Sequence, residues 1–185
     1  MPEQSETRCD QPLRFSIPAL NARGRMVRLD AVLNDVLSAH AYPPAVEKIL
    51  AEGLVLTALL GTTLKEREGQ LTIQAQTENG PLSLLVTDYI DGAVRGYAQF
   101  DLAKLAEVPS DPDLFALFGK GYLAVTFDRL LPKAQGGGRY QGIVPLEGAN
   151  LSDAAMQYFD QSEQIPTFIR IAIDHVDGRC VAGGI

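Results

Sequence analysis

The sequence has little of the chemistry on which metal sites and disulfide frameworks depend. Only two cysteines and two histidines occur among its 185 residues. Cys9 and Cys180 lie near opposite ends of the chain, and neither has a Cys-x-x-Cys partner. Metal sites and disulfide frameworks need several such residues at short, regular spacing. We therefore expect two reduced thiols, and neither a metal nor another cofactor bound by this chain.

Catalytic and nucleotide-binding patterns are missing as well. The sequence contains no Gly-x-Ser-x-Gly elbow and no His-Glu-x-x-His spacing. The glycine clusters at 119–121 and 136–142 match no phosphate-binding loop, so they predict turns. His175 and Cys180 could meet, but only the acids that flank His175 lie near in sequence to orient a base, and we reject this pair as a nucleophile. The sequence favours a binding or structural protein, with no catalytic residue, over an enzyme.

Long apolar segments and excess positive charge are also absent. The formal net charge is -7 with an isoelectric point near 4.8, and a field of this sign repels nucleic acid and anionic lipid. Residues 1–12 are polar and acidic, unlike a secretory signal. The longest apolar run stops well short of the about 20 residues that a membrane span needs. We expect a cytoplasmic protein that binds neither nucleic acid nor membrane.

The most informative stretch present is YPPAVEKILAEGLVLTALLGTTLK at 42–65. Its two prolines suit the first turn of a helix, because their φ is already close to the helical value. From Leu54 to Leu60 only Thr57 is polar, so protein must cover every side of the helix. This pattern predicts a buried central helix with four almost fully buried leucines: Leu54, Leu56, Leu59 and Leu60.

Strand and helix patterns occupy most of the remaining chain. Alternating apolar residues predict strands at 13–17, 71–76, 82–89, 94–100, 123–127, 140–146 and 169–173. Asn79-Gly80 and Asp91-Gly92 suggest tight hairpins that make residues 71–100 an antiparallel meander. Helical spacing predicts helices at 29–37, 110–118 and 151–159, the last capped by Asn150. The predicted fold class is α+β, with antiparallel sheets packed around a buried central helix and further amphipathic helices.

A short basic segment, NARGRMVR at 21–28, places three arginines around Gly24. One interpretation is a solvated loop and strand edge. The alternative is an anion site, in which case the chain would be a small-anion-binding protein or an enzyme that uses the Arg23 to Arg28 segment.

Several strings of residues together identify a family. They are RGR at 23–25, VRL at 27–29, YP at 42–43, the central helix, LTIQAQ at 71–76, NGP at 79–81, RGYA at 95–98, YQGIV at 140–144 and YF at 158–159 followed by QSEQIPT at 161–167. In this order and spacing the chain resembles the thirty-three-kilodalton heat-shock chaperone family, the redox-regulated holdases, from about Leu13 to its end. The QSEQIPT string is the most specific of them.

The resemblance implies an ATP-independent holdase that binds unfolding proteins under oxidative stress, and a homodimer in which segments are exchanged. It also implies a C-terminal module that holds zinc through four cysteines when reduced, and this sequence lacks those cysteines. We therefore expect the N-terminal core alone, a truncated chain or stable fragment without the zinc redox switch. The expected domains are a flexible arm at 1–12, a chaperone core at 13–175 and the start of a truncated linker at 176–185, which closes no part of the fold.

The surface that binds client proteins stays unknown at this stage, because such a surface needs exposed apolar area and no particular reactive group. The meander at 71–100 is our candidate. One of its faces is predicted to be wet, and this polar face could rim a groove.

Overall fold

The computed structural model describes residues 10–64, 69–129 and 138–185. Residues 1–9 of the expected arm at 1–12, and residues 136 and 137 of the second glycine cluster, lie outside these residues. The strands form two antiparallel sheets, with the orders β1-β2-β9-β8 and β5-β4-β3-β6-β7. Their bounds are β1 Leu13–Ile17, β2 Ala22–Leu29, β3 Gly69–Gln76, β4 Leu82–Ile90, β5 Ala93–Phe100, β6 Tyr122–Arg129, β7 Gly138–Pro145, β8 Ile171–Val176 and β9 Arg179–Gly184.

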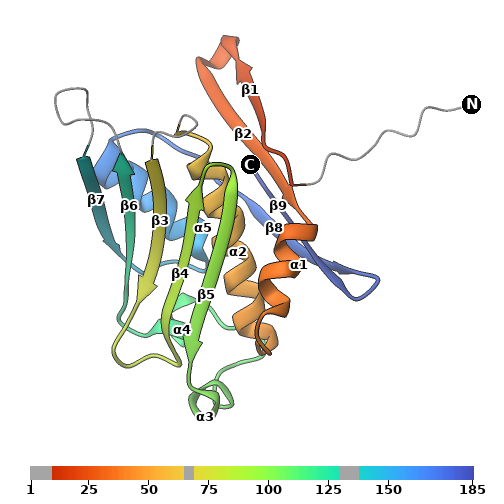
Figure 1. The fold of residues 1–185 in the computed structure, drawn as a ribbon. Helices are drawn as coiled ribbons and strands as arrows, with labels where there is room; N and C mark the ends of the chain where they lie inside the picture. The colour runs from red at the N-terminus through yellow and green to blue at the C-terminus, as the bar shows by residue number, and fades with distance from the viewer. Residues whose placement is uncertain (1–9, 65–68, 130–137) are drawn as a thin grey trace, which may run out of the picture.

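Helix α2, Pro44–Gly61, lies between the two sheets and is the centre of the core (Figure 1). It begins as the two prolines predict, with Pro43 as the extended N-cap and Pro44 as the first helical residue. Every residue from Ile49 to Gly61 is buried. The four predicted leucines, Leu54, Leu56, Leu59 and Leu60, are 0%, 0%, 5% and 7% exposed, so the prediction of a helix covered on all sides is confirmed.

Smaller helices complete the α+β fold. Helix α1, Ala31–Ser38, and helix α5, Leu151–Tyr158, pack against α2. As predicted, the side chain of Asn150 caps α5 by accepting a hydrogen bond from the backbone of Asp153. The remaining helices are short: η1 Pro18–Leu20, α3 Leu102–Leu105, α4 Leu114–Phe118 and the π-helical turn η3 Phe159–Glu163. Among the described residues, no helix combines the length and apolarity of a membrane span.

Two local predictions are corrected by the turns that the chain uses. Helix α4 starts at Leu114 and not at Ser110. The side chain of Asp113 caps the helix by accepting a hydrogen bond from the backbone N–H of Ala116. Asp91 and Gly92 have the positive φ values, 49° and 86°, of a tight hairpin. Neither Asn79 nor Gly80 has a positive φ. The β3–β4 connection spans residues 77–81 instead, and Gly80 is packed there against the backbone of Phe118.

The glycine-rich C-terminal residues were expected to close nothing, and this is wrong for 179–184. They form β9, which lies between β2 and β8. A Cβ atom on Gly184 would be 2.7 Å from Cγ1 of Val55 in α2. Glycine therefore permits close approach of this strand to the central helix, and the segment belongs to the folded core.

A buried carboxylate joins α2 to α5. Glu52 is 7% exposed, and its Oε1 accepts hydrogen bonds from the backbone N–H and the hydroxyl of Ser152, both at 3.0 Å. Burial raises the pKa of Glu52, and the hydrogen bonds from Ser152 offset only part of this effect. The folded protein therefore holds the Glu52 proton more tightly than the unfolded chain.

This raised pKa predicts a pH-dependent effect of Glu52→Gln. The stability that protonated Glu52 contributes is lost as the pH rises through its folded-state pKa, whereas a glutamine still accepts from Ser152 and does not titrate. The melting temperature of the variant minus that of the parent should increase between about pH 4 and about pH 8. Thermal unfolding across this range measures the difference, and a constant difference would contradict the role assigned to the carboxylate.

Candidate functional site

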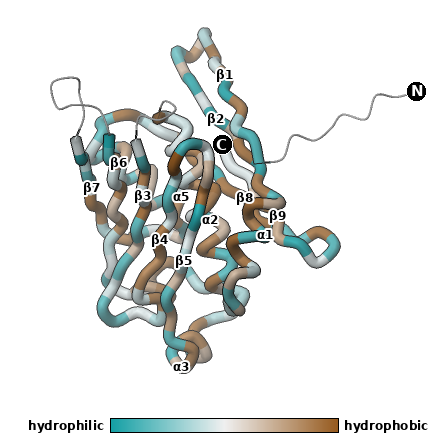
Figure 2. Tube along the Cα trace, viewed as in Figure 1, coloured by the Kyte–Doolittle hydropathy of each residue, from teal (hydrophilic) through white to brown (hydrophobic). Residues whose placement is uncertain are grey.

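An apolar groove lies where the β1–β2 hairpin meets the segment at 165–169. The hairpin projects beyond the body of the molecule (Figure 1), and its colouring alternates between hydrophilic and hydrophobic (Figure 2). The groove has a volume of about 470 Å³, with Leu59 and Leu60 of α2 at its base. Large apolar side chains that line it are exposed, among them Ile17 42%, Ile165 53% and Phe168 67%.

The hairpin wall of the groove depends on one glycine. Phe15 and Gly24 are directly paired across β1 and β2. A Cβ atom on Gly24 would lie 2.1 Å from Cζ of Phe15, so the ring lies directly over the glycine. This contact gives a physical reason for the glycine in the Arg-Gly-Arg string. Only glycine leaves room for an aromatic ring across this strand pair.

The opposite wall is anchored by a buried tyrosine. Tyr158 is fully buried, and its ring lies over Gly142 of β7, where a Cβ atom would be 2.3 Å from Cε2. Its hydroxyl bonds to Glu163 at 2.6 Å, and burial together with Glu163 raises the pKa of Tyr158. The chain then turns through Gln164, which has a φ of 55°. This turn presents Ile165 and Phe168 at the surface.

Two arginines, Arg23 and Arg25, border the same groove. Arg14 and Arg25 are paired across β1 and β2, and Arg14 donates to the carbonyl of Thr62, the C-cap of α2, at 3.2 Å. Burial and the charge of Arg14 lower the pKa of Arg25. The Nε atom of Arg25 is buried and has no hydrogen-bond partner within the described part of the chain.

The three arginines of the predicted anion segment do not converge. Arg23 and Arg25 line the groove, whereas strand alternation places Arg28 on the opposite face of β2. Arg28 lines a separate pocket that also contains Asp10 and Asp30. The structure therefore divides the Arg23 to Arg28 segment between two surfaces.

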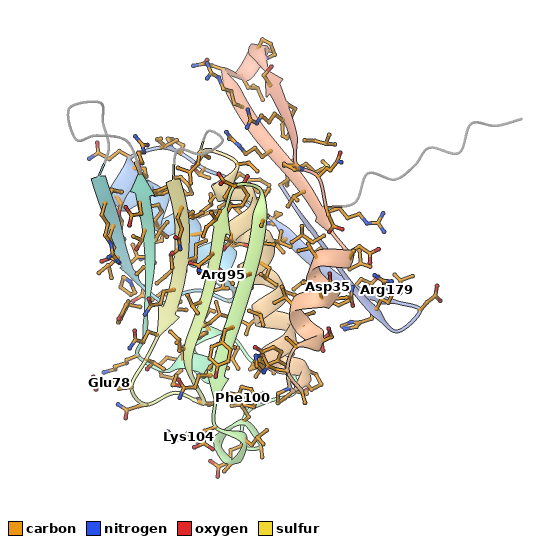
Figure 3. The ribbon with its side chains drawn as sticks, viewed as in Figure 1. Asp35, Glu78, Arg95, Phe100, Lys104 and Arg179 are labelled. Atoms are coloured by element: carbon orange, nitrogen blue, oxygen red, sulfur yellow. The ribbon has the colours of Figure 1, made fainter. Side chains whose placement is uncertain are left out.

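The meander at 71–100 exposes a mainly polar face. Leu71, Ile73 and Ala75 of β3 point into the core and are fully buried. On the other face Asp88 accepts from Thr72 at 2.6 Å and from Arg95, labelled in Figure 3, at 2.9 Å. This face carries hydrogen-bonded polar groups, and the apolar groove lies elsewhere, at the β1–β2 hairpin.

The fold also brings His175 and Cys180 together, with an acid that is remote in sequence. His175 and Cys180 are partners across β8 and β9, and a ring nitrogen of His175, Nε2, lies 2.8 Å from Oε1 of Glu47. One ligand atom from each of the three residues lies within 4.8 Å of the others. Sequence reasoning missed Glu47, because it lies 128 positions before His175.

The state of the thiol argues against a nucleophile at this cluster. Cys180 is 3% exposed, and burial, with a further contribution from the charge of Glu47, raises its pKa to about 11. The reactive species is the thiolate, which a raised pKa disfavours at neutral pH. His175 and Cys180 therefore do meet, but the burial of Cys180 argues against a catalytic pair.

An α+β core that carries an apolar, arginine-bordered groove has the features of a binding domain. A sequence model of one family, described as Hsp33 protein, matches residues 10–185. The chain belongs to this family, which confirms the resemblance found in the sequence.

Relatives with established names agree with this assignment. A protein named 33 kDa chaperonin from Caulobacter vibrioides (strain NA1000 / CB15N) is 42% identical over 167 residues, which cover 88% of this chain and 53% of the relative. A protein of the same name from Yersinia pestis (strain Pestoides F) is 40% identical over 176 residues, covering 95% of this chain and 57% of the relative. The chain thus spans a little over half the length of these relatives.

A solved structure confirms the fold. The 33 kDa chaperonin of Thermotoga maritima, also described as a heat shock protein 33 homolog, superposes with a TM-score of 0.75 at 23% identity. The match covers 94% of this chain and 60% of that chain.

Proposed function

We propose that this chain is the core of an ATP-independent holdase chaperone, which binds unfolding proteins in the cytoplasm under oxidative stress. The observation that carries the proposal is the gathering of exposed apolar side chains around one groove. Contiguous apolar surface of this kind marks an interaction site in a protein that stays folded in water. The family membership favours unfolded proteins as the occupant, and no catalytic role is assigned.

The groove suits an unfolded segment in two respects. Phe15, Ile165 and Phe168 would contact apolar side chains of a client, and burying such a side chain contributes about 1.5–3 kcal/mol. Arg25 lines the groove, and the accessible part of its guanidinium group would pair with an acidic client side chain. We therefore place client binding at the groove and not at the meander at 71–100.

No redox step is assigned to this chain. The zinc module implied by the resemblance needs four thiolates, and the sequence has two cysteines. The residues present do not fit that group. The proposed holding activity therefore rests on the apolar surface alone.

The test is suppression of aggregation with matched variants. Light scattering would follow a chemically unfolded client diluted into buffer that contains a thiol reductant and no nucleotide. Phe168 lies at the groove and is 67% exposed, while Phe115 of α4 lies away from it and is 66% exposed. Phe168→Ser should weaken suppression severalfold, and Phe115→Ser should leave it unchanged, because only Phe168 offers apolar area at the groove.

A second chain competes for the same surface. We propose a homodimer that covers part of the groove, so sedimentation should accompany the scattering assay. A monomer that leaves client aggregation unchanged, with and without oxidant, would contradict the holdase proposal. Arg25-dependent binding of inorganic phosphate by such a monomer would instead favour the alternative, a small-anion-binding protein or enzyme.

A further inference from the structure

The cluster of Glu47, His175 and Cys180 lies apart from the groove, on helix α2 and the β8–β9 hairpin. We propose that it is a binding site for one divalent transition metal ion of the zinc type. The three side chains supply a carboxylate oxygen, an imidazole nitrogen and a sulfur, all within 4.8 Å of one another. Zinc accepts all three donor types and commonly uses three protein ligands with a fourth position open to solvent.

The register of the hairpin holds two of the ligands in place. Asp177 and Gly178 have φ values of 51° and 77°, which give a tight two-residue turn closed by Val176 and Arg179. His175 and Cys180 are the next pair and lie directly opposite each other. Directly opposed residues on adjacent antiparallel strands have Cβ atoms about 4.5–5.5 Å apart, so their side chains point to one side together.

Helix α1 fixes the backbone of the sulfur ligand. The side-chain amide of Asn34 donates to the carbonyl of Cys180 at 2.8 Å, and its oxygen accepts from the Cys180 N–H at 3.1 Å. At the end of the hairpin Arg179, labelled in Figure 3, bonds to Asp30 at 2.9 Å. Both contacts are made by β9, so the strand that carries the sulfur ligand is attached to α1 and its N-cap, and Cys180 is held in place before an ion binds.

The geometry needs only a small adjustment to hold an ion. Ligand atoms at the bond lengths of zinc, about 2.0–2.3 Å, lie about 3–4 Å from one another. His175 is exposed and can move, and it forms the solvent side of the cluster, while Cys180 is buried. On binding, the thiol loses its proton to solvent as the metal–sulfur bond forms, and the contact between His175 and Glu47 gives way to two metal bonds.

The proximity of these three side chains differs from what their positions in the sequence suggest. We expected no metal ligands to cluster because the two cysteines and two histidines are scattered in sequence. The hairpin pairs one of each, and α2 adds the carboxylate. The residues are unrelated to the four cysteines that the family resemblance implies, so the proposal does not depend on the proposed function.

Cobalt and zinc provide the test. In the untagged 185-residue chain with Cys9→Ser, which leaves Cys180 as the one thiol, Co²⁺ should bind with one equivalent and produce a thiolate-to-cobalt charge-transfer band. Zn²⁺ should displace it. Cys180→Ser should abolish the band, and His175→Asn or Glu47→Gln should weaken affinity by at least about tenfold. His40→Asn, a change at the second histidine, is the matched control and should bind like the parent.

Circular dichroism and thermal unfolding establish that each variant is folded. Zn²⁺ should raise the melting temperature of the parent and of His40→Asn, but not that of Cys180→Ser. Absence of a charge-transfer band in the folded parent would overturn the proposal, and so would a band of equal strength in Cys180→Ser. Aggregation assays are not needed for this result, so it is separate from the outcome for the holdase.

Discussion

Leu54→Ala is expected to lower the free energy of unfolding by about 2 to 5 kcal/mol, through the loss of apolar burial and the cavity that remains. Leu54 is 0% exposed, and its Cδ2 lies 3.1 Å from the position that a Cβ atom on Gly96 of β5 would take. The side chain thus fills the space between α2 and the five-stranded sheet. Urea denaturation of parent and variant measures the difference.

Leu102→Ala provides the control for this prediction. Leu102 lies in the short helix α3 and is 67% exposed, so its truncation should change stability by less than about 0.5 kcal/mol. Equal and small effects at both positions would show that α2 does not organise the core.

Gly61→Ala should destabilise the protein even though alanine is the better helix former. Helix propensity alone would favour the change by about 1 kcal/mol. However, the added Cβ atom would lie 2.2 Å from Cγ and 2.6 Å from Cβ of Tyr89 in β4. The Cβ atom of Tyr89 moves only with its backbone, so a rotamer change does not relieve the clash. We expect a net loss of about 1 to 3 kcal/mol, as for other overpacked sites.

Gly53→Ala is the comparison within the same helix. A Cβ atom there would lie 3.1 Å from Cδ2 of Leu85 and 3.3 Å from Cγ2 of Thr87. Both are terminal methyl groups, and small shifts can accommodate the new atom. Denaturation should therefore rank Gly61→Ala as clearly more destabilising than Gly53→Ala, and the reverse order would contradict the packing of α2 against β4.

The groove connects this packing to the proposed function. Its base is formed by Leu59 and Leu60, near the C-terminal end of α2. The same helix that fills the core therefore supports the surface on which a client would bind. A variant that shifts this end of α2 should be judged by its stability before any change in aggregation suppression is attributed to the groove.

Local patterns determined which segments became helices and strands. Prolines 43 and 44 set the start of α2, and the apolar surroundings of Thr57 required burial on every side, because an exposed face of that composition would be unfavourable in water. Alternation predicted β1 and the strands from β3 to β8, but neither β2 nor β9. Strand β7, whose last residue is Pro145, lies at an edge of the five-stranded sheet, where proline is tolerated. Together with the family strings, these features determined the α+β class and the family from sequence alone.

Tertiary structure decided what distant segments make together. The groove joins residues 15–25 to residues 159–169, and the metal-type cluster joins Glu47 to a hairpin more than a hundred residues later. Spacing along the chain carries no information about such contacts, because sheet order and strand register set them. The glycines of β9 illustrate the same limit. In sequence they suggest a flexible end, whereas in the fold they permit a strand to pack directly against α2.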